Sequence, residues 1–279
     1  MNNTLIKGLG LLETLSHADQ PMGVTELANR LEIGKSTVHR LLQALVEQGY
    51  VRRNEASGSY AASIKLWELG SAVLSNLDLS HASQSWMAWL LERTRETVHL
   101  SVLDGDEVVY VHKLDSPEPV RAYSAIGGRA PAHCVATGKA MLAFEPMAQL
   151  TSLSRHLSAC SPRTLTVPAE FLREMERVRE QGYAVNRGEW RESVGGVAAP
   201  VRDPGGAVIA AIGVSGPIER LRAARLKILS ADLIQAADGI TTALRGDARP
   251  TLRTKPSSAP SGAHLNAPLR QTPKKARLQ

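Results

Sequence analysis

One stretch, residues 24–51, limits what this chain can fold into more than any other. Its first part places three apolar side chains on one helical face: Leu27, Ala28 and Leu31. We expect the Thr25 hydroxyl to cap this helix, because a side-chain oxygen there can accept a hydrogen bond from a free N–H. Residues 32–34 are too few for a separate loop, and Gly34 is expected to allow a sharp reversal. The pattern predicts a helix-turn-helix.

The second helix of this stretch is predicted to be the one that reads DNA. Its apolar side chains have the spacing of a buried stripe: Val38, Leu41, Leu42 and Leu45. The polar side chains left on the outer face crowd toward its N-terminal half: Lys35, Ser36, Thr37, His39, Arg40 and Gln43. Such a helix end suits a major groove. The alternative is an ordinary pair of packed helices whose charged residues are surface groups.

The residues after Gly49 predict a two-stranded ribbon. Residues 50–53 read as a strand, residues 54–59 as a turn, and a second strand begins at Tyr60. A ribbon directly after a recognition helix is a wing, and we expect Arg52, Arg53 and Tyr60 to reach phosphates or the neighbouring minor groove.

Further along the chain, alternating and helical patterns succeed one another as in an antiparallel sheet with flanking helices. Helices are predicted at 4–15, 64–77 and 81–95, after residues 127–134, from Pro168 to Gly182, and from Pro217 onward. Strands are predicted at 97–102, 107–112, 120–126, 194–201 and 207–215. The helix at 64–77 is expected to link two domains and to dimerise, with simple packing onto one domain as the alternative.

Four blocks of the sequence, in this order, resemble the IclR family of bacterial transcription regulators. They are LANRLEIGKSTVHRLLQALVEQGYVRR, HLSVLDGDEVVYVHK, GGRAPAHCVATGKAMLA and GEWRESVGGVAAPVRDPGGAVIAAIGVSGP. The resemblance covers residues 4 to about 245. It implies an α+β fold made of a winged helix-turn-helix, a linker helix and a GAF/PAS-like effector-binding domain. The expected bounds are 1–62 for the DNA-binding domain, 63–80 for the linker, 81–245 for the effector-binding domain and 246–279 for a disordered basic tail.

The resemblance also implies where an effector binds, at the glycine loop 127–134 and on the later strands. Free N–H groups at the helix that follows this loop would suit a carboxylate. Carried over, the expected effector residues are Gly128, Arg129, Cys134, Asn186, Gly196, Gly213 and Ser215. Glycines at 196 and 213, where some relatives have Cys and Ser, suggest more room and fewer polar groups. The expected ligand is a small organic acid of the hydroxybenzoate kind, its carboxylate paired by Arg129 or by Arg187.

The positive charge of the chain is concentrated in residues 246–279. This tail holds seven basic residues and one acidic residue, whereas the rest of the chain holds 26 of each, so the formal net charge of +6 lies in the tail. The tail is rich in Pro, Ser and Ala, and we expect it to be disordered. It is either a solvated extension or an element that attracts DNA without sequence preference.

Composition excludes several other classes of protein. No apolar run reaches membrane-spanning length and no signal peptide is recognisable, so a cytoplasmic protein is expected. Cys134 and Cys160 are the only cysteines, which excludes a disulfide framework. His133 and Cys134 are a potential metal pair, but no third ligand can be assigned, so neither a metal nor a cofactor is expected.

The sequence therefore predicts a regulator, repressor or activator, that binds double-stranded operator DNA as a homodimer or dimer of dimers under the control of a small acid. Two alternatives come from other classes. One is a small-molecule-processing enzyme, for which Cys134 with His99 or His112 would be the candidate dyad. The other is a DNA-binding protein without a ligand.

Overall fold

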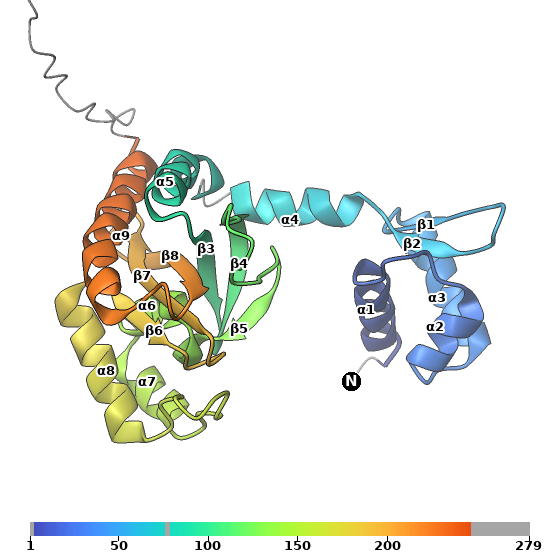
Figure 1. The fold of residues 1–279 in the computed structure, drawn as a ribbon. Coiled ribbons are helices and arrows are strands. Elements are labelled where there is room, and N and C mark those ends of the chain that lie inside the picture. The colour runs from blue at the N-terminus through green and yellow to red at the C-terminus, as the bar shows by residue number, and fades with distance from the viewer. Residues whose placement is uncertain (1–2, 76–78, 247–279) are drawn as a thin grey trace, which may run out of the picture. The chain divides into compact units, whose positions relative to one another are not determined.

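The computed structural model describes residues 3–75 and 79–246, so residues 76–78 of the predicted linker and residues 247–279 of the predicted tail lie outside the described residues. Figure 1 shows the order of the elements. The N-terminal part holds α1 (Asn3–Ser16), α2 (Val24–Arg30), α3 (Lys35–Glu47), β1 (Val51–Arg53) and β2 (Tyr60–Ala62). Its core includes the predicted stripe, with Val38, Leu41 and Leu42 buried against Leu11, Leu15 and Leu27. The two strands pair antiparallel. The winged helix-turn-helix is confirmed.

Two local predictions for the turn are wrong. Thr25 does not cap α2, because the helix starts one residue earlier, at Val24, and Gly23 is the N-cap. The reversal does not depend on Gly34, whose φ of −63° is ordinary and which caps α3. It depends on Glu32, whose φ is 53°. The Ile33 N–H donates to Ala28 O at 3.1 Å, so α2 ends in a Schellman turn that tolerates a non-glycine residue.

Apolar side chains remain exposed on α1 and around α4 (Lys65–Ser75). Leu5 and Leu9 of α1 are exposed, and α1 reaches the core through Leu11 and Leu15. Trp67 on α4 is 68% exposed, and Ile64 just before the helix is exposed as well. Exposed apolar residues that gather into a contiguous patch can mark an interaction surface.

The C-terminal part is built on a six-stranded antiparallel sheet of order β5-β4-β3-β8-β7-β6 (Figure 1). The strands are β3 (Thr97–Asp104), β4 (Glu107–Leu114), β5 (Arg129–Pro131), β6 (Ala184–Arg187), β7 (Val194–Arg202) and β8 (Val208–Pro217). The helices are α5 (Leu79–Thr94), α6 (Ala136–Leu142), α7 (Met147–Ser154), α8 (Pro168–Gln181) and α9 (Ala223–Leu244), with a 3-10 turn η1 (Ala132–Cys134) before α6.

Each face of the sheet carries its own apolar core. One core joins the sheet to α5 and α9 through residues such as Leu90, Ile212 and Leu233. The other joins it to α6, α7 and α8 through residues such as Met141 and Phe171. All seven residues of α6 are buried, including Lys139. This confirms the predicted antiparallel sheet with flanking helices. No helix within 3–75 or 79–246 has the length and apolar character needed to cross a bilayer.

Three predicted boundaries differ. Residues 120–126 form an irregular loop instead of a strand, with Val120, Tyr123 and Ile126 exposed. Their alternation suggested a strand, but the neighbouring edge of β4 is taken by β5. Pro217 ends β8 instead of opening a helix, since its strand position pairs with Val194. The last helix starts at Ala223.

The close approach of η1 and α6 generates a first prediction. A Cβ at Gly138 would lie 2.1 Å from the backbone oxygen of Ala132, an atom that cannot move freely. We expect Gly138→Ala to lower the free energy of unfolding by about 1–3 kcal/mol, as overpacking does. Gly70→Ala is the matched control, since Gly70 is an exposed helical glycine with no atom within 4 Å of the added carbon. Urea unfolding that finds both variants equally stable would contradict this packing.

Candidate DNA-binding face and ligand pocket

The outer face of α3 presents the side chains that the sequence assigned to DNA. Five of them are exposed (Lys35, Ser36, His39, Arg40 and Gln43), and Thr37 is half-buried. The opposite face of the helix is anchored in the core by its apolar stripe. The helix therefore offers its polar N-terminal half while its packing fixes the direction in which that half points.

The wing agrees with the prediction for two of its three residues. Arg52 and Arg53 are exposed on β1, and Arg53 lies 3.9 Å from Glu55 across the turn. Tyr60 does not reach outward, because its side chain is only 5% exposed and belongs to the N-terminal core. Its backbone also exchanges two hydrogen bonds with Met22. Tyr60 thus anchors the wing and is not available to a phosphate.

A small pocket with a cavity volume of about 40 Å³ lies in the C-terminal domain between the sheet, the start of α6 and the 115–127 loop. Its polar lining residues are His99, Ser124, Thr137, Asn186, Arg191 and Ser215. Its aromatic lining residues are Tyr110, Tyr123 and Trp190. A concave, largely apolar space with a few placed polar groups is what small-molecule sites look like.

His99 is the polar centre of this pocket. Its Nε2 lies 2.5 Å from Ser215 Oγ and its Nδ1 lies 3.2 Å from Ser124 Oγ. The pKa of His99 is lowered from 6.5 to about 4, mainly by burial and in part by the nearby Lys113 cation, while Asp115 opposes the shift. The imidazole is therefore neutral at physiological pH, with one ring nitrogen donating and the other accepting.

The orientation of two further polar side chains of the pocket is fixed by neighbouring residues. Asn186 Oδ1 accepts hydrogen bonds from the N–H groups of Gly188 and Glu189, both at 2.9 Å, which leaves its NH2 group as the part able to bond a ligand. Arg191 stacks on Trp190, with its Cζ 4.7 Å from the ring centroid. Burial raises the pKa of Tyr110 to about 12, against the opposing charge of Arg191. The guanidinium of Arg191 is the positively charged group of the pocket lining.

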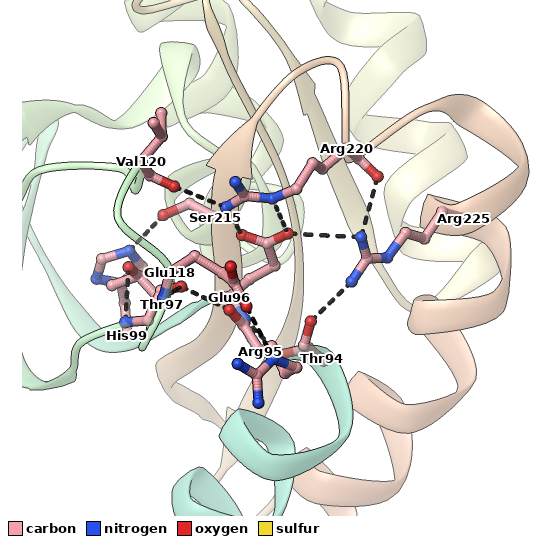
Figure 2. Close-up of polar contacts among 11 residues, drawn as sticks. Thr94, Arg95, Glu96, Thr97, His99, Glu118, Val120, Ser215, Arg220 and Arg225 are labelled. Carbon is pink, nitrogen blue, oxygen red and sulfur yellow. Dashed lines mark hydrogen bonds and ion pairs between the residues drawn. The ribbon is translucent and has the colours of Figure 1, made fainter.

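An ion cluster forms around the buried Glu96, directly before β3, with two half-buried arginines (Figure 2). Glu96 is 1% exposed and accepts two bonds from Arg220, from Nε at 2.8 Å and from a terminal nitrogen at 2.6 Å. The same Arg220 nitrogen donates to Val120 O at 2.9 Å. Arg225 adds an ion pair to Glu96 at 3.5 Å. This cluster ties the start of β3 and the segment before α9 to the loop that carries Tyr123 and Ser124.

Four of the seven predicted effector residues line the pocket: Asn186, Gly196, Gly213 and Ser215. Gly128 does not, since its amide donates to Ala125 O and its carbonyl accepts from Tyr110 N–H. Arg129 is exposed and paired with Asp104 and Glu107, each at 2.6 Å. Cys134 is buried beside Cys160, and burial raises the pKa of its thiol. The glycine loop is therefore a sheet-edge turn in which the N–H groups of Gly127 and Gly128 are already used.

The expectation of extra room at the two glycines is also wrong. A Cβ at Gly213 would lie 2.8 Å from Thr137 Cγ2, and one at Gly196 would lie 2.8 Å from Val214 O. The space above these glycines is filled by the protein itself, so they serve close packing. Sequence reasoning missed His99, Ser124 and Arg191 as pocket residues. The signal for Arg191 was its place beside Trp190 in the GEWRES block.

The buried His99 generates a prediction on pH. Between pH 6.5 and about 4 the unfolded chain binds a proton at this residue and the folded chain does not, so the free energy of unfolding falls as pH is lowered through that window. The full effect corresponds to about 3 kcal/mol. We expect the stability difference between the parent chain and His99→Gln, measured by urea unfolding, to shrink by that order from pH 7 to pH 4.5. A difference independent of pH would contradict a neutral buried imidazole.

Both domains of this architecture match domains of known proteins. Residues 4–55 match the IclR helix-turn-helix domain, and residues 71–242 match the bacterial transcriptional regulator IclR C-terminal domain. The HTH-type transcriptional regulator KdgR of Escherichia coli K12 is 36% identical over 241 residues, which span 86% of this chain and 91% of KdgR.

Solved structures agree. The IclR of Thermotoga maritima is 28% identical with a TM-score of 0.73, over 88% of this chain and 99% of that chain. An IclR homologue from Microbacterium hydrocarbonoxydans, complexed with 4-hydroxybenzoate, is 27% identical with a TM-score of 0.77, over 88% of this chain and all of that chain. The two domain matches and this similarity along most of the chain show that the protein belongs to the IclR family of HTH-type transcription regulators.

Proposed function

We propose that this regulator binds operator DNA through α3 and the wing, and that a small organic acid in the pocket around His99 controls the binding. The observation that carries the DNA part is the outer face of α3, where five polar side chains are exposed on a helix whose other face is locked in the core. Arg40 is the residue of this face best able to bond a guanine with two N–H groups. Arg52 and Arg53 would add contacts to phosphates.

The domain division supports this assignment of roles. We assign residues 1–62 to DNA binding, 63–80 to the linker and 81–245 to effector binding. The exposed Leu5, Ile64 and Trp67 would be covered by a second copy, so a homodimer, alone or paired into a tetramer, fits a two-fold operator. A protein that acts on bacterial operator DNA works in the cytoplasm, where we place this one.

The pocket favours an acid with an apolar or aromatic body. Arg191 supplies a cation for a carboxylate, the neutral His99, Ser215 and Asn186 supply hydrogen bonds for hydroxyl or keto groups, and Tyr110 and Trp190 supply flat apolar contacts. The homologue that holds 4-hydroxybenzoate supports an aromatic acid. Arg191 replaces Arg129 and Arg187 as the expected partner of the carboxylate.

The alternative function as an enzyme has one specific observation in its favour, the 2.5 Å contact between His99 and Ser215. Such a pair resembles a base and its nucleophile. However, a histidine whose pKa is about 4 is a weak base at neutral pH, and its second nitrogen faces the hydroxyl of Ser124 instead of a carboxylate. Binding without turnover is the better interpretation, and recovery of unchanged ligand after incubation would support it.

The other alternative, a DNA-binding protein without a ligand, predicts equal operator affinity with and without acids.

The role of α3 is tested with Arg40→Ala. We expect operator affinity to fall about 10-fold or more, because loss of one good base contact costs about 1–3 kcal/mol. The measurement is fluorescence anisotropy of labelled DNA from the protein's own upstream intergenic region, against scrambled DNA, at physiological salt. Arg173→Ala on α8, an exposed arginine of the other domain, is the control. Unchanged affinity and footprint of the Arg40 variant would remove this residue from the readout.

The role of Arg191 is tested by calorimetry with 4-hydroxybenzoate, benzoate and small keto acids. We expect Arg191→Gln to weaken binding of the preferred acid about 10-fold, since hydrogen bonds to charged groups contribute about 1.5–3 kcal/mol. Arg187→Gln is the matched control, because Arg187 is an exposed arginine four residues away that does not line the pocket. Equal losses in the two variants would show that bulk charge, and not the Arg191 position, attracts the acid.

A further inference from the structure

Three side chains able to bind a metal meet beside the start of α6: His133, Cys134 and Cys160. One ligand atom from each lies within 4.8 Å of the other two. The first two are adjacent in η1, whereas Cys160 comes from the loop between α7 and α8. The sequence offered only the His133–Cys134 pair, and the fold supplies the third donor.

The His133 ring is oriented as in a metal site. Its Nε2 lies 3.0 Å from the carbonyl oxygen of Ser158, which can only accept, so Nε2 carries the proton. The neutral ring then has a bare lone pair on Nδ1. That atom is buried and has no hydrogen-bond partner among the described residues. Metal-binding histidines have this arrangement, with one nitrogen donating to a backbone carbonyl and the other left for the ion.

The loop that brings Cys160 is held in place by its own hydrogen bonds. Thr164 Oγ1 accepts from the N–H groups of Cys160, at 3.0 Å, and Ser161, at 2.9 Å. The same hydroxyl donates to Glu189 O at 2.6 Å. The Cys160 position is therefore fixed relative to the strand end that carries Asn186, which gives the donor set a built frame.

We propose that His133 Nδ1, Cys134 Sγ and Cys160 Sγ bind a thiophilic metal ion, with Zn²⁺ as the ion that suits them. Two thiolates and an imidazole are soft to intermediate donors, which favour zinc over calcium or magnesium. Metal–ligand bonds of about 2.0–2.3 Å place tetrahedral ligand atoms roughly 3.5–3.8 Å apart, so each pair of the three atoms needs to close by about 1.3 Å at most. Binding releases the two thiol protons to solvent. The fourth position opens toward the surface beside Cys160, where water can complete the tetrahedron.

The site adjoins the effector pocket without sharing its residues. Cys134 runs directly into Val135, Ala136 and Thr137, which line one wall. Ser161, next to Cys160, donates to Gly188 O at 2.7 Å behind the other wall. A bound ion would therefore clamp two pocket walls together. The metal site goes beyond the proposed function, because ion binding requires neither DNA nor effector.

The test uses the full-length protein, reduced and freed of metal with a chelator, and then titrated with Zn²⁺ against a chromophoric competitor. We expect one ion per chain. Losing a residue that only hydrogen-bonds to a metal ligand costs about 10–100-fold in metal affinity. Losing a direct ligand in Cys160→Ser or His133→Gln should therefore weaken zinc binding at least about 100-fold. His156→Gln, an exposed histidine of the same region, is the control and should bind zinc as the parent does.

Cobalt gives an independent readout, since Co²⁺ bound by two thiolates shows sulfur-to-metal charge transfer and strong tetrahedral bands that Cys160→Ser should lose. Cys160 lies at the surface, so this variant should fold, and its melting curve without metal checks that it does. Absence of a stoichiometric zinc site in the parent, or equal zinc affinity in parent and Cys160→Ser, would overturn the proposal. The proposal would also be overturned if the two thiols of the parent protein stay unbound in the presence of Zn²⁺ and react only with each other, forming a disulfide in air.

Discussion

The ammonium group of Lys139 has no access to solvent, and much of the C-terminal fold is arranged around it. Its side chain is 0% exposed, with Nζ 2.6 Å from Glu189 Oε2 and 3.3 Å from Glu174 Oε1. A buried charge without partners is very costly, and removing one member of a buried pair typically costs about 3–5 kcal/mol. The three segments that carry these residues, α6, α8 and the turn after β6, must therefore come together.

The two carboxyl groups of this triad differ. Burial raises the pKa of Glu189 above its ordinary value even though Lys139 pulls it down. Burial also acts to raise the pKa of Glu174, but Lys139 and Arg177 outweigh it and the pKa is lowered. Glu174 is thus the carboxylate that is held in its charged form. Glu96, whose side chain is buried, and the half-buried Arg220 form a second ion pair of this domain.

The sequence predicts those parts of the structure that local periodicity controls. The stripe from Val38 to Leu42, the hairpin around Gly105 and the helix ended by Gly182 all follow from spacing and turn chemistry, and all are present. These predictions fail where contacts between residues far apart in the chain determine the local structure. The 115–127 loop has a strand-like pattern, but Arg220, about a hundred residues away, holds Val120 O outside any sheet.

The site was harder to predict than the fold for the same reason. Ser215 could be placed because it belongs to a strand with a clear pattern, and the family resemblance pointed to both Ser215 and Asn186. His99 could not, because its partners Ser124 and Ser215 come from segments whose proximity depends on the complete sheet order. Cys134 likewise belongs with Cys160 and not with the pocket, which only the folded α7–α8 loop reveals.

The same contacts restrict how a ligand can act. A ligand shifts an equilibrium only by binding one arrangement more tightly than another. Most of the pocket wall is sheet or fully buried α6, which have little freedom to rearrange. The 115–127 loop is different, since it exposes Tyr123 and its middle part is held by a few polar bonds, from Arg220 to Val120 O, from Lys113 to Ser124 O and between Ser124 and His99. A ligand that competes with Ser124 for His99 would act on this loop first, so the loop is where two arrangements of the pocket can differ in affinity.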